Sequence, residues 1–259
     1  NGTSGTITLN TTNTALSGTA ADLVSAFAGT ITTHTGDITI TDTPTNAQLE
    51  LIDAATTGNI TYSGSNDYTV SDSTISAGQL NSLDAQYSGT VDATAVTTIT
   101  GTAADITTVY SSSGISGLGN EAINVNSGSA HTSQVNALAA DTSAVVTATI
   151  SDGDMATLAG LSETGNAYTI TITDHSVAAA ALNTLDGKTT VAINASIITT
   201  LTGSVADLNT AYAANGSSIT GLGDEAITLG DSSLAVSVLN TLDGHTSGTI
   251  NASSINTLT

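Results

Sequence analysis

Short runs in which threonine alternates with isoleucine, valine or leucine recur along the chain. An alternation with a period of two is typical of a half-buried β-strand, because successive side chains point to opposite faces. The pattern predicts strands at five places, residues 5–9, 37–41, 89–93, 168–172 and 248–252. Each run is only about five residues long, so we expect short strands, as the mode for strand length allows.

Between these runs, apolar residues recur three and four positions apart, which predicts short helices with one buried stripe. The clearest stripe contains Val177, Ala181, Leu182 and Leu185. Glycine after such a segment favours a helix end, which we place at Gly187 and, in the related segment, at Gly244.

The expected helix starts carry capping residues. A Thr or Ser hydroxyl can accept from the amide three residues on, where an Asp also suits the helix dipole. This arrangement occurs three times, as Thr19 with Asp22, Thr102 with Asp105, and Ser204 with Asp207. The single proline, Pro44, is placed for the first turn of another helix.

The chain is internally repetitive. The sequence LNTLDG at residues 182–187 returns at residues 239–244, and LNSLD at residues 80–84 is an earlier copy of the same element. A longer match joins residues 114–123 to residues 218–227, with a small insertion relative to the offset between 80–84 and 182–186. We therefore predict one repeat array over residues 1–259, with units of about 25 residues grouped in blocks of about 57.

Strands separated by helices cannot pair as tight hairpins, so neighbouring units are expected to align their strands in parallel. The predicted fold class is α/β, a repeat solenoid of short parallel strands and short helices with a leucine-rich-repeat-like plan. Residues 59–63 and 67–71 leave room for a hairpin or for two strand passes in one coil, and an all-β solenoid is the alternative. Thr259 falls where the next helix would begin, so we expect a fragment of a longer array.

The amino-acid composition excludes several classes of partner and of stabilising feature. Hydrophobic residues make up 39% of the chain but aromatic residues only 3%, and a core of small aliphatic side chains suits stacked repeats. The formal charge is −21, with Lys188 as the single basic residue, which excludes nucleic acid as a partner and disfavours anionic lipid. There are no cysteines and no long apolar run, so we expect neither disulfides nor insertion into a membrane.

The phrases LNTLDG at 239–244 and GSVADLNTAY at 203–212 resemble low-complexity repeats of very large secreted surface proteins of bacteria, notably of marine cyanobacteria. The resemblance covers most of the chain, with residues 135–175 diverging. It implies an extracellular, tandem-repeat, acidic scaffold at the cell surface and carries over no catalytic residues.

Three aspartates end the Leu-Asn-x-Leu-Asp element: Asp84, Asp186 and Asp243. They are candidate ligands of a Ca²⁺ ladder with one carboxylate per unit, completed by loop carbonyl groups. The alternative is a turn-closing Asp that hydrogen-bonds nearby backbone amides, which we favour because the chain has no EF-hand loop and no calcium-binding nonapeptide. No other cofactor is expected.

The four histidines, His34, His131, His175 and His245, lie in segments rich in Thr, Ser and Gly. We expect them to be solvent-exposed turn residues, because adjacency such as Asp174-His175-Ser176 is not the geometry of a catalytic triad. The sequence therefore predicts no enzyme.

The predicted function is a non-enzymatic structural segment of an extracellular surface protein or filament. Its expected partners are other copies of itself, associating end to end or laterally. The alternative is a Ca²⁺- or glycan-binding adhesin module in which many weak sites supply avidity.

Overall fold

The structure is a computed structural model that describes residues 13–28, 34–62, 67–87 and 89–259. Its contacts divide the chain into two compact bodies. The first body comprises residues 1–71, 79–95 and 112–117, and the second comprises residues 72–78, 96–111 and 118–259. Each body is described by itself.

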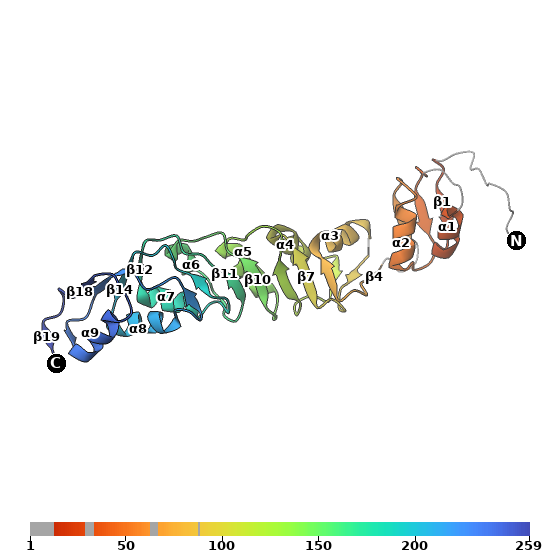
Figure 1. Cartoon of the computed structure of the whole chain (residues 1–259). Coiled ribbons are helices and arrows are strands. Elements are labelled where there is room, and N and C mark those ends of the chain that lie inside the picture. Colours follow the sequence, from red (N-terminus) through yellow and green to blue (C-terminus); the bar gives the residue numbers. More distant parts are fainter. Residues whose placement is uncertain (1–12, 29–33, 63–66, 88) are drawn as a thin grey trace. The chain divides into compact units, whose positions relative to one another are not determined.

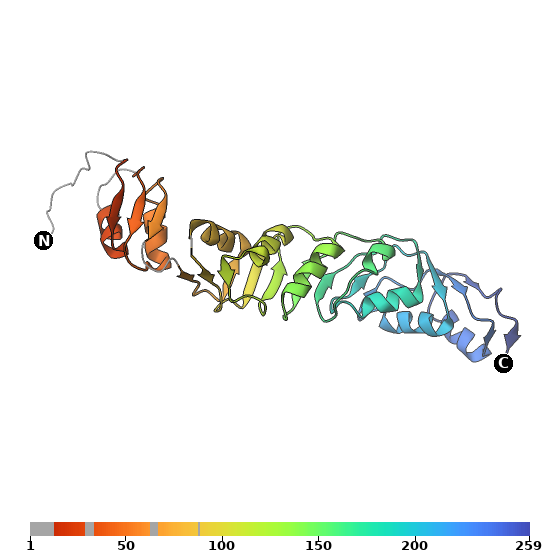
Figure 2. The same ribbon diagram turned by 180° about the vertical axis from the view of Figure 1, so that it is seen from behind.

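The first body contains a parallel sheet of three strands with two helices beside it (Figure 2). In chain order its elements are β1 (Leu16–Gly18), α1 (Ala20–Phe27), β2 (Ile38–Ile40), α2 (Asn46–Asp53) and β3 (Ile60–Tyr62). A second small parallel sheet joins β4 (Tyr68–Thr69), β6 (Val91–Asp92) and β8 (Ile115–Ser116). Helix α3 (Ala77–Gln86) begins in the second body and continues in the first.

The second body is built on two larger parallel sheets (Figure 1). The first has the order β11-β10-β9-β7-β5, formed by β5 (Thr74–Ser76), β7 (Thr98–Gly101), β9 (Ala122–Val125), β10 (Val146–Thr149) and β11 (Ala167–Thr169). The second has the order β12-β14-β16-β18, formed by β12 (Ser176–Ala178), β14 (Thr200–Gly203), β16 (Ala226–Leu229) and β18 (Ile250–Asn251). Two further pairs join β13 (Ile193–Asn194) to β15 (Ile219–Thr220), and β17 (Ser233–Leu234) to β19 (Thr257–Leu258).

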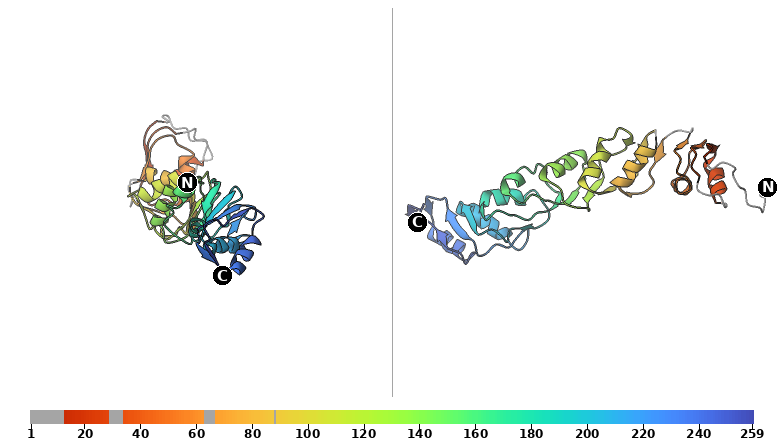
Figure 3. Two further views of the ribbon diagram at one scale, coloured as in Figure 1. Left: turned by 90° about the vertical axis from the view of Figure 1, so that its left-hand side faces the viewer. Right: turned by 90° about the horizontal axis from the view of Figure 1, so that it is seen from above.

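Helices follow the strands of the second body in a regular order. They are α4 (Ala103–Ser111), α5 (Thr132–Asp141), α6 (Met155–Leu158), α7 (Ala179–Asp186), α8 (Val205–Ala214) and α9 (Val236–Asp243). Helix α4 contacts α5, α6 contacts α7, α7 contacts α8, and α8 contacts α9, and in Figure 3 they follow one another in a row beside the strands. We call a strand together with the helix that follows it a strand–helix segment.

Every strand pair among the described residues is parallel, and the partners are separated by similar lengths of chain. The partners nearest in sequence are Thr147 and Ala167, in β10 and β11, and among the most distant are Thr200 and Ala226, in β14 and β16. A parallel pair needs a crossover connection. Each crossover here contains one short helix, and in most pairs it also contains a strand that belongs to another sheet.

The core consists of aliphatic side chains that alternate with outward-facing polar ones. Ile99, Ile123 and Leu201 are buried in the centres of their strands, while the flanking Thr98 and Thr100 are half-exposed. Burial of branched aliphatic side chains from both strands and helices stabilises the fold without a wide interior.

The predicted α/β class is confirmed, and the all-β alternative is wrong because short helices lie between groups of strands along the described residues. The strand predicted at 37–41 is observed as β2, and those at 89–93, 168–172 and 248–252 overlap β6, β11 and β18. The strand predicted at residues 5–9 lies outside the described residues. The hairpin considered for residues 59–71 is not formed by β3 and β4, because they belong to different sheets.

Two local predictions about helices need correction. Ala181 is exposed, and the stripe of α7 instead uses Ala179 with Leu182 and Leu185, because Val177 lies in strand β12 before the helix. Pro44 precedes the N-cap instead of opening the helix: Thr45 caps α2 and forms a capping box with Gln48.

The helices end at the predicted glycines, but the glycines have ordinary helical angles. Gly187 and Gly244 are the C-cap residues with φ of −69° and −74°. The left-handed conformation that makes glycine favourable at helix ends is therefore not used there. None of the helices in the described ranges is both long enough and apolar enough to cross a membrane.

Candidate functional site

The three aspartates proposed as calcium ligands lie at the last turns of α3, α7 and α9. Asp84 accepts a hydrogen bond from the Ser112 hydroxyl at 2.7 Å, and Asp186 accepts one from the Ser218 hydroxyl at 2.9 Å. Asp243 is exposed. Within the described residues no three His, Asp or Glu side chains gather in a group that could hold a metal ion, and the calcium ladder stays a prediction.

Asp84 and Asp186 instead tie the end of one helix to a serine about 30 residues further on. In the first body, Ser112 also accepts from the backbone N–H of Gly114, just before strand β8. A chain from carboxylate to hydroxyl to amide therefore fixes the loop that leads into the next strand.

A second set of aspartates caps helices from a distance. The backbone N–H of the first helical residue donates to an Asp that lies 19 to 26 residues later in the chain. The four pairs are Ala20 with Asp42 at 2.7 Å, Thr132 with Asp152 at 2.6 Å, Met155 with Asp174 at 2.7 Å, and Val205 with Asp231 at 2.7 Å. Each helix start is therefore completed by the strand–helix segment that follows it.

The physical reason is that the first amides of a helix have no partner inside the helix, and the helix dipole favours an anion there. Three of these helices also have a local cap, and in α6 it is Asp154, which accepts from the Thr157 amide. Thr19 and Ser204 accept from the amides of Asp22 and Asp207, as the sequence predicts, and Thr102 does the same for Asp105. The local cap satisfies the third amide, and the distant Asp satisfies the first.

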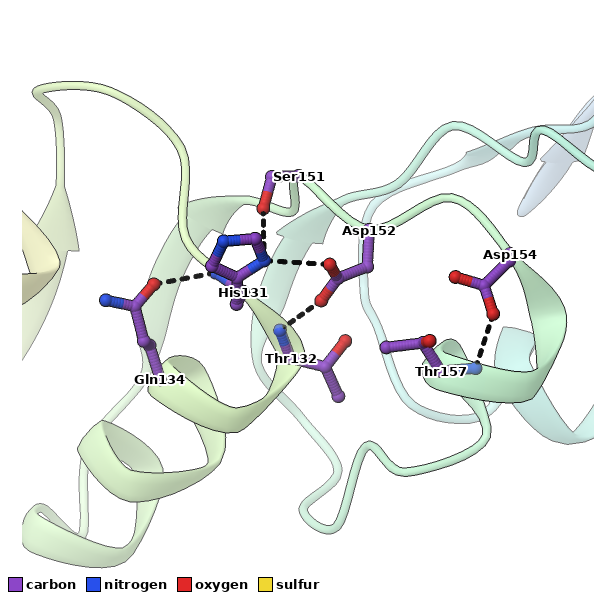
Figure 4. A network of polar contacts seen from close by, with 7 residues as sticks. All are labelled: His131, Thr132, Gln134, Ser151, Asp152, Asp154 and Thr157. Atoms are coloured by element: carbon purple, nitrogen blue, oxygen red, sulfur yellow. Dashed lines mark hydrogen bonds and ion pairs between the residues drawn. The ribbon is translucent and has the colours of Figure 1, made fainter.

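The cap at α5 is the centre of a larger polar network (Figure 4). Asp152 receives the Thr132 amide on one oxygen, and its other oxygen lies 2.8 Å from Nδ1 of His131. Ser151 Oγ lies 3.1 Å from the same nitrogen, and the His131 amide donates to Gln134. The pKa of Asp152 lies below its usual range. The main cause is the hydrogen bond from the Thr132 amide, and the contact with His131 is the second.

Ser151 and Asp152 both contact the same ring nitrogen of His131, Nδ1, whereas in a catalytic triad the Ser and the Asp contact opposite nitrogens of the imidazole. The imidazole of His131 is 66% exposed, and its contacts are explained by capping of α5. The Asp174-His175-Ser176 run contains the residue types of a catalytic triad, but its side chains bind elsewhere. The Asp174 carboxylate caps α6, and His175 Nδ1 lies 3.0 Å from the Ile197 carbonyl oxygen.

Four threonines form a repeated corner between segments. Each hydroxyl donates to a backbone carbonyl 21 or 22 residues earlier and accepts from the amide two residues later. The donations are Thr56 to His34 at 3.3 Å, Thr142 to Glu121 at 2.6 Å, Thr189 to Tyr168 at 2.7 Å, and Thr246 to Glu225 at 2.7 Å. The acceptances, from Gly58, Ala144, Val191 and Gly248, are 3.0 to 3.1 Å long.

Two of these corners enclose a fully buried glutamate. Glu121 accepts from the Tyr110 hydroxyl at 2.9 Å and from the Gly119 amide at 2.9 Å. Glu225 accepts from the Tyr212 hydroxyl at 2.9 Å and from the Gly223 amide at 3.0 Å. We call these the Tyr110–Glu121 pair and the Tyr212–Glu225 pair; their glutamates lie in the repeated segments 114–123 and 218–227.

Both tyrosines are held in the protonated form. Burial, reinforced by the neighbouring Glu, raises the pKa of the Tyr110 and Tyr212 hydroxyls well above their usual range. A buried carboxylate is costly unless hydrogen bonds satisfy it, and a protonated tyrosine supplies one of those bonds. The pairs are therefore structural contacts that join α4 to the residue before β9 and α8 to the residue before β16.

The histidine prediction is wrong for His34, which is completely buried, while the other three are exposed. The His34 ring packs against Phe27 with ring centroids 6.1 Å apart. Sequence reasoning also missed the distant aspartate caps and the buried glutamates. The sequence does contain a sign of the Tyr–Glu pairs, because each Glu occurs at the same position of a repeated motif, directly before an apolar strand.

The polar side chains of the molecule thus mainly join one strand–helix segment to the next. Comparison with protein-family models, with curated proteins and with solved structures found no match for this chain.

Proposed function

We propose that the chain is a non-enzymatic structural segment of an extracellular surface protein or filament, folded as a solenoid with a leucine-rich-repeat-like plan. One observation carries the proposal: every described strand pair is parallel. The paired residues are about 20 to 26 residues apart, within the range of solenoid repeat lengths. In a solenoid each unit contacts mainly its neighbours, and this spacing is what such stacking requires.

The use of the carboxylates supports a scaffold. Asp42, Asp152, Asp174 and Asp231 cap helices of the preceding segment, and the two buried glutamates bind tyrosines. Such carboxylates have internal donors and do not need a cation to satisfy them. The remaining acidic side chains keep a long assembly soluble by repulsion.

The repeat proposal is tested by removing one whole block. Deletion of residues 187–243 joins Asp186 to Gly244, which is the counterpart of Gly187 in the second LNTLDG element. The shortened chain is expected to fold, with unchanged helix content per residue by circular dichroism and a cooperative thermal transition. Small-angle scattering should show a shorter particle of the same cross-section.

Deletion of residues 187–231 is the matched control. It joins the end of α7 directly to Ser232 and places helix and strand out of phase, so it should lose the cooperative transition. If both deletions fold equally well, or if both unfold, the chain is not a stack of interchangeable units and the solenoid proposal fails.

The adhesin alternative keeps one specific prediction. A module held together by Ca²⁺ at Asp84, Asp186 and Asp243 would melt at a much higher temperature with the ion than with a chelator. For a scaffold whose carboxylates are satisfied internally, the two melting temperatures should agree within about 2 °C. Replacement of the three aspartates by asparagine separates a specific effect from general screening.

A further inference from the structure

The acceptor motif for N-linked glycosylation, Asn-x-Ser/Thr, recurs along the chain. Its asparagines are Asn1, Asn10, Asn59, Asn194, Asn215 and Asn251, of which Asn1 and Asn10 lie outside the described residues. The sugar is attached to the side-chain nitrogen Nδ2, so a transferase must reach this atom and the hydroxyl group of the third residue. The motifs of the described residues differ in whether these two groups are accessible.

Asn194 leaves both groups accessible. It is exposed at the end of strand β13, and its Oδ1 accepts a hydrogen bond from the Ser196 amide at 3.1 Å. This turn uses the oxygen of the side chain and leaves the nitrogen free. Ser196 is also exposed, and among the described residues neither its hydroxyl group nor Nδ2 of Asn194 forms a hydrogen bond.

The backbone around Asn194 is fixed on both sides. Asn194 pairs with Thr220 of β15 and forms an isolated bridge with Thr171. Gly221, with a φ of +88°, packs so closely that a β-carbon there would lie 2.7 Å from Cα of Ser196. Asn194 is therefore exposed at a position with strand partners on both sides and not at an edge.

Asn215 and Asn59 have the motif but not the accessible groups. Nδ2 of Asn215 donates to the Leu222 carbonyl at 2.9 Å, and its Oδ1 accepts from the Leu222 amide at 3.3 Å. In the motif of Asn59, the Thr61 hydroxyl donates to the Ile38 carbonyl at 3.2 Å. Reaction at either motif requires these bonds to break first.

We infer that Asn194 is an acceptor site for an N-linked glycan. The inference rests on the extracellular location proposed above, and the sugar donor it requires is an oligosaccharide linked to a lipid diphosphate. A bond forms between Nδ2 and the anomeric carbon of the sugar while the bond from that carbon to the diphosphate oxygen breaks. The lipid diphosphate leaves, and a base of the transferase takes up the proton lost from Nδ2.

The same site returns one repeat block later. Oδ1 of Asn251 accepts from the Ser253 amide at 3.1 Å, and Asn251 pairs with Thr228 as Asn194 bridges to Thr171. Glycans at equivalent positions of successive blocks add a neutral, hydrated cover to an acidic array.

An earlier copy of this turn supplies a substitution that retains the fold. Asp92 pairs with Thr69 and Ser116, and its Oδ1 accepts from the Thr94 amide at 3.0 Å. The turn therefore forms with Asp as well as with Asn. Asn194→Asp is expected to keep the turn while it removes the nitrogen to which the sugar is attached.

The test measures glycosylation of the folded full chain by a purified oligosaccharyltransferase with a lipid-diphosphate-linked oligosaccharide. Peptide mass spectrometry gives the rate at each asparagine, divided by the rate for the same motif as a free peptide. This ratio should be at least about tenfold higher for Asn194 than for Asn215 or Asn59, because their motifs must first lose hydrogen bonds. An Asn194 ratio equal to or below theirs overturns the inference.

Two substitutions at Ser196 provide the matched controls. Ser196→Ala keeps the backbone amide that forms the turn but removes the hydroxyl group, so it should abolish modification of Asn194, as Asn194→Asp should. Ser196→Thr restores the motif and should retain the modification. Modification of Asn194 that persists in Ser196→Ala contradicts an acceptor that depends on the motif.

Protein isolated from its own cells shows whether the site is used. Secreted chain should carry a glycan at Asn194, and secreted chain with unmodified Asn194 overturns the inference while the proposed location stands. A chain retained inside the cells contradicts the proposed location and, with it, the use of the site. The rates with the purified transferase do not depend on location, so the two failures are distinguishable.

Discussion

The Tyr110–Glu121 pair and the Tyr212–Glu225 pair are built from the same motif but are completed differently. In the second pair, the Gly223 amide contacts both carboxylate oxygens of Glu225 at 3.0 Å. In the first, the Gly119 amide contacts only Oε2 of Glu121, and the buried Oε1 has no hydrogen-bond partner among the described residues.

The residue contributed by the following segment also differs. His245 stacks on Tyr212, with ring centroids 5.3 Å apart and planes 8° apart. The equivalent position next to Tyr110 is Asp141, whose pKa is raised by partial desolvation. The motif fixes the Tyr–Glu bond in both places, while the neighbour decides how completely the carboxylate and the ring are satisfied.

The largest expected effect tests what the pairs share. Glu121→Ala and Glu225→Ala each leave a buried tyrosine hydroxyl and a glycine amide without an acceptor, so each should lower the free energy of unfolding by about 3 kcal/mol. Urea unfolding followed by circular dichroism measures this. The exposed Asp243→Ala serves as control and should change stability by less than about 0.5 kcal/mol.

The next effect separates the two carboxylates. In Glu121→Gln the amide nitrogen can replace the unpartnered Oε1, and the remaining oxygen keeps both hydrogen bonds. In Glu225→Gln the new NH₂ group must face the Gly223 N–H. We expect Glu225→Gln to lower the free energy of unfolding by about 1 to 2 kcal/mol more than Glu121→Gln does. Equal losses in urea unfolding would show that the two carboxylates are satisfied equally.

Alkaline pH should affect both pairs through their tyrosines. The folded-state pKa is raised, so stability is complete below the unfolded pKa of about 10 and is lost as pH rises towards the folded value. Burial also raises the pKa of Tyr62 and Tyr168, each to about 12. Melting temperature should therefore fall above pH 10, and Tyr110→Phe and Tyr212→Phe should each make that fall shallower.

The smallest effect concerns the stacked histidine. His245→Ala removes the ring against Tyr212 and should cost about 0.5 to 1 kcal/mol. Asp141→Ala at the equivalent position removes no ring contact and should leave stability unchanged or slightly higher. If the two substitutions have the same effect on the urea midpoint, the neighbours do not distinguish the pairs.

The sequence predicts the features that depend on local chemistry. The alternation of Thr with Ile at 37–41 identifies β2, and the hydroxyls of Thr19, Thr102 and Ser204 are recognisable as helix caps. These features follow from the side-chain period and from bonds three residues apart. The prediction for Pro44 is wrong because a proline suits both the first helical turn and the position before a cap.

The features that the sequence does not predict depend on contacts between segments. Nothing near Asp152 or Asp231 indicates that its partner is an amide 20 or 26 residues earlier. A glutamate is usually exposed, and the burial of Glu121 and Glu225 follows only once Tyr110 and Tyr212 are brought alongside. The prediction for His34 fails for the same reason.

The distant aspartate caps affect the order in which the helices become stable during synthesis. The start of α5 lacks its acceptor until Asp152 has been made, and the start of α8 lacks its acceptor until Asp231 has been made. During synthesis from the amino terminus, the four helices with such caps would therefore remain incompletely stabilised until the next strand–helix segment emerged. Ordering should advance along the nascent chain one segment behind elongation.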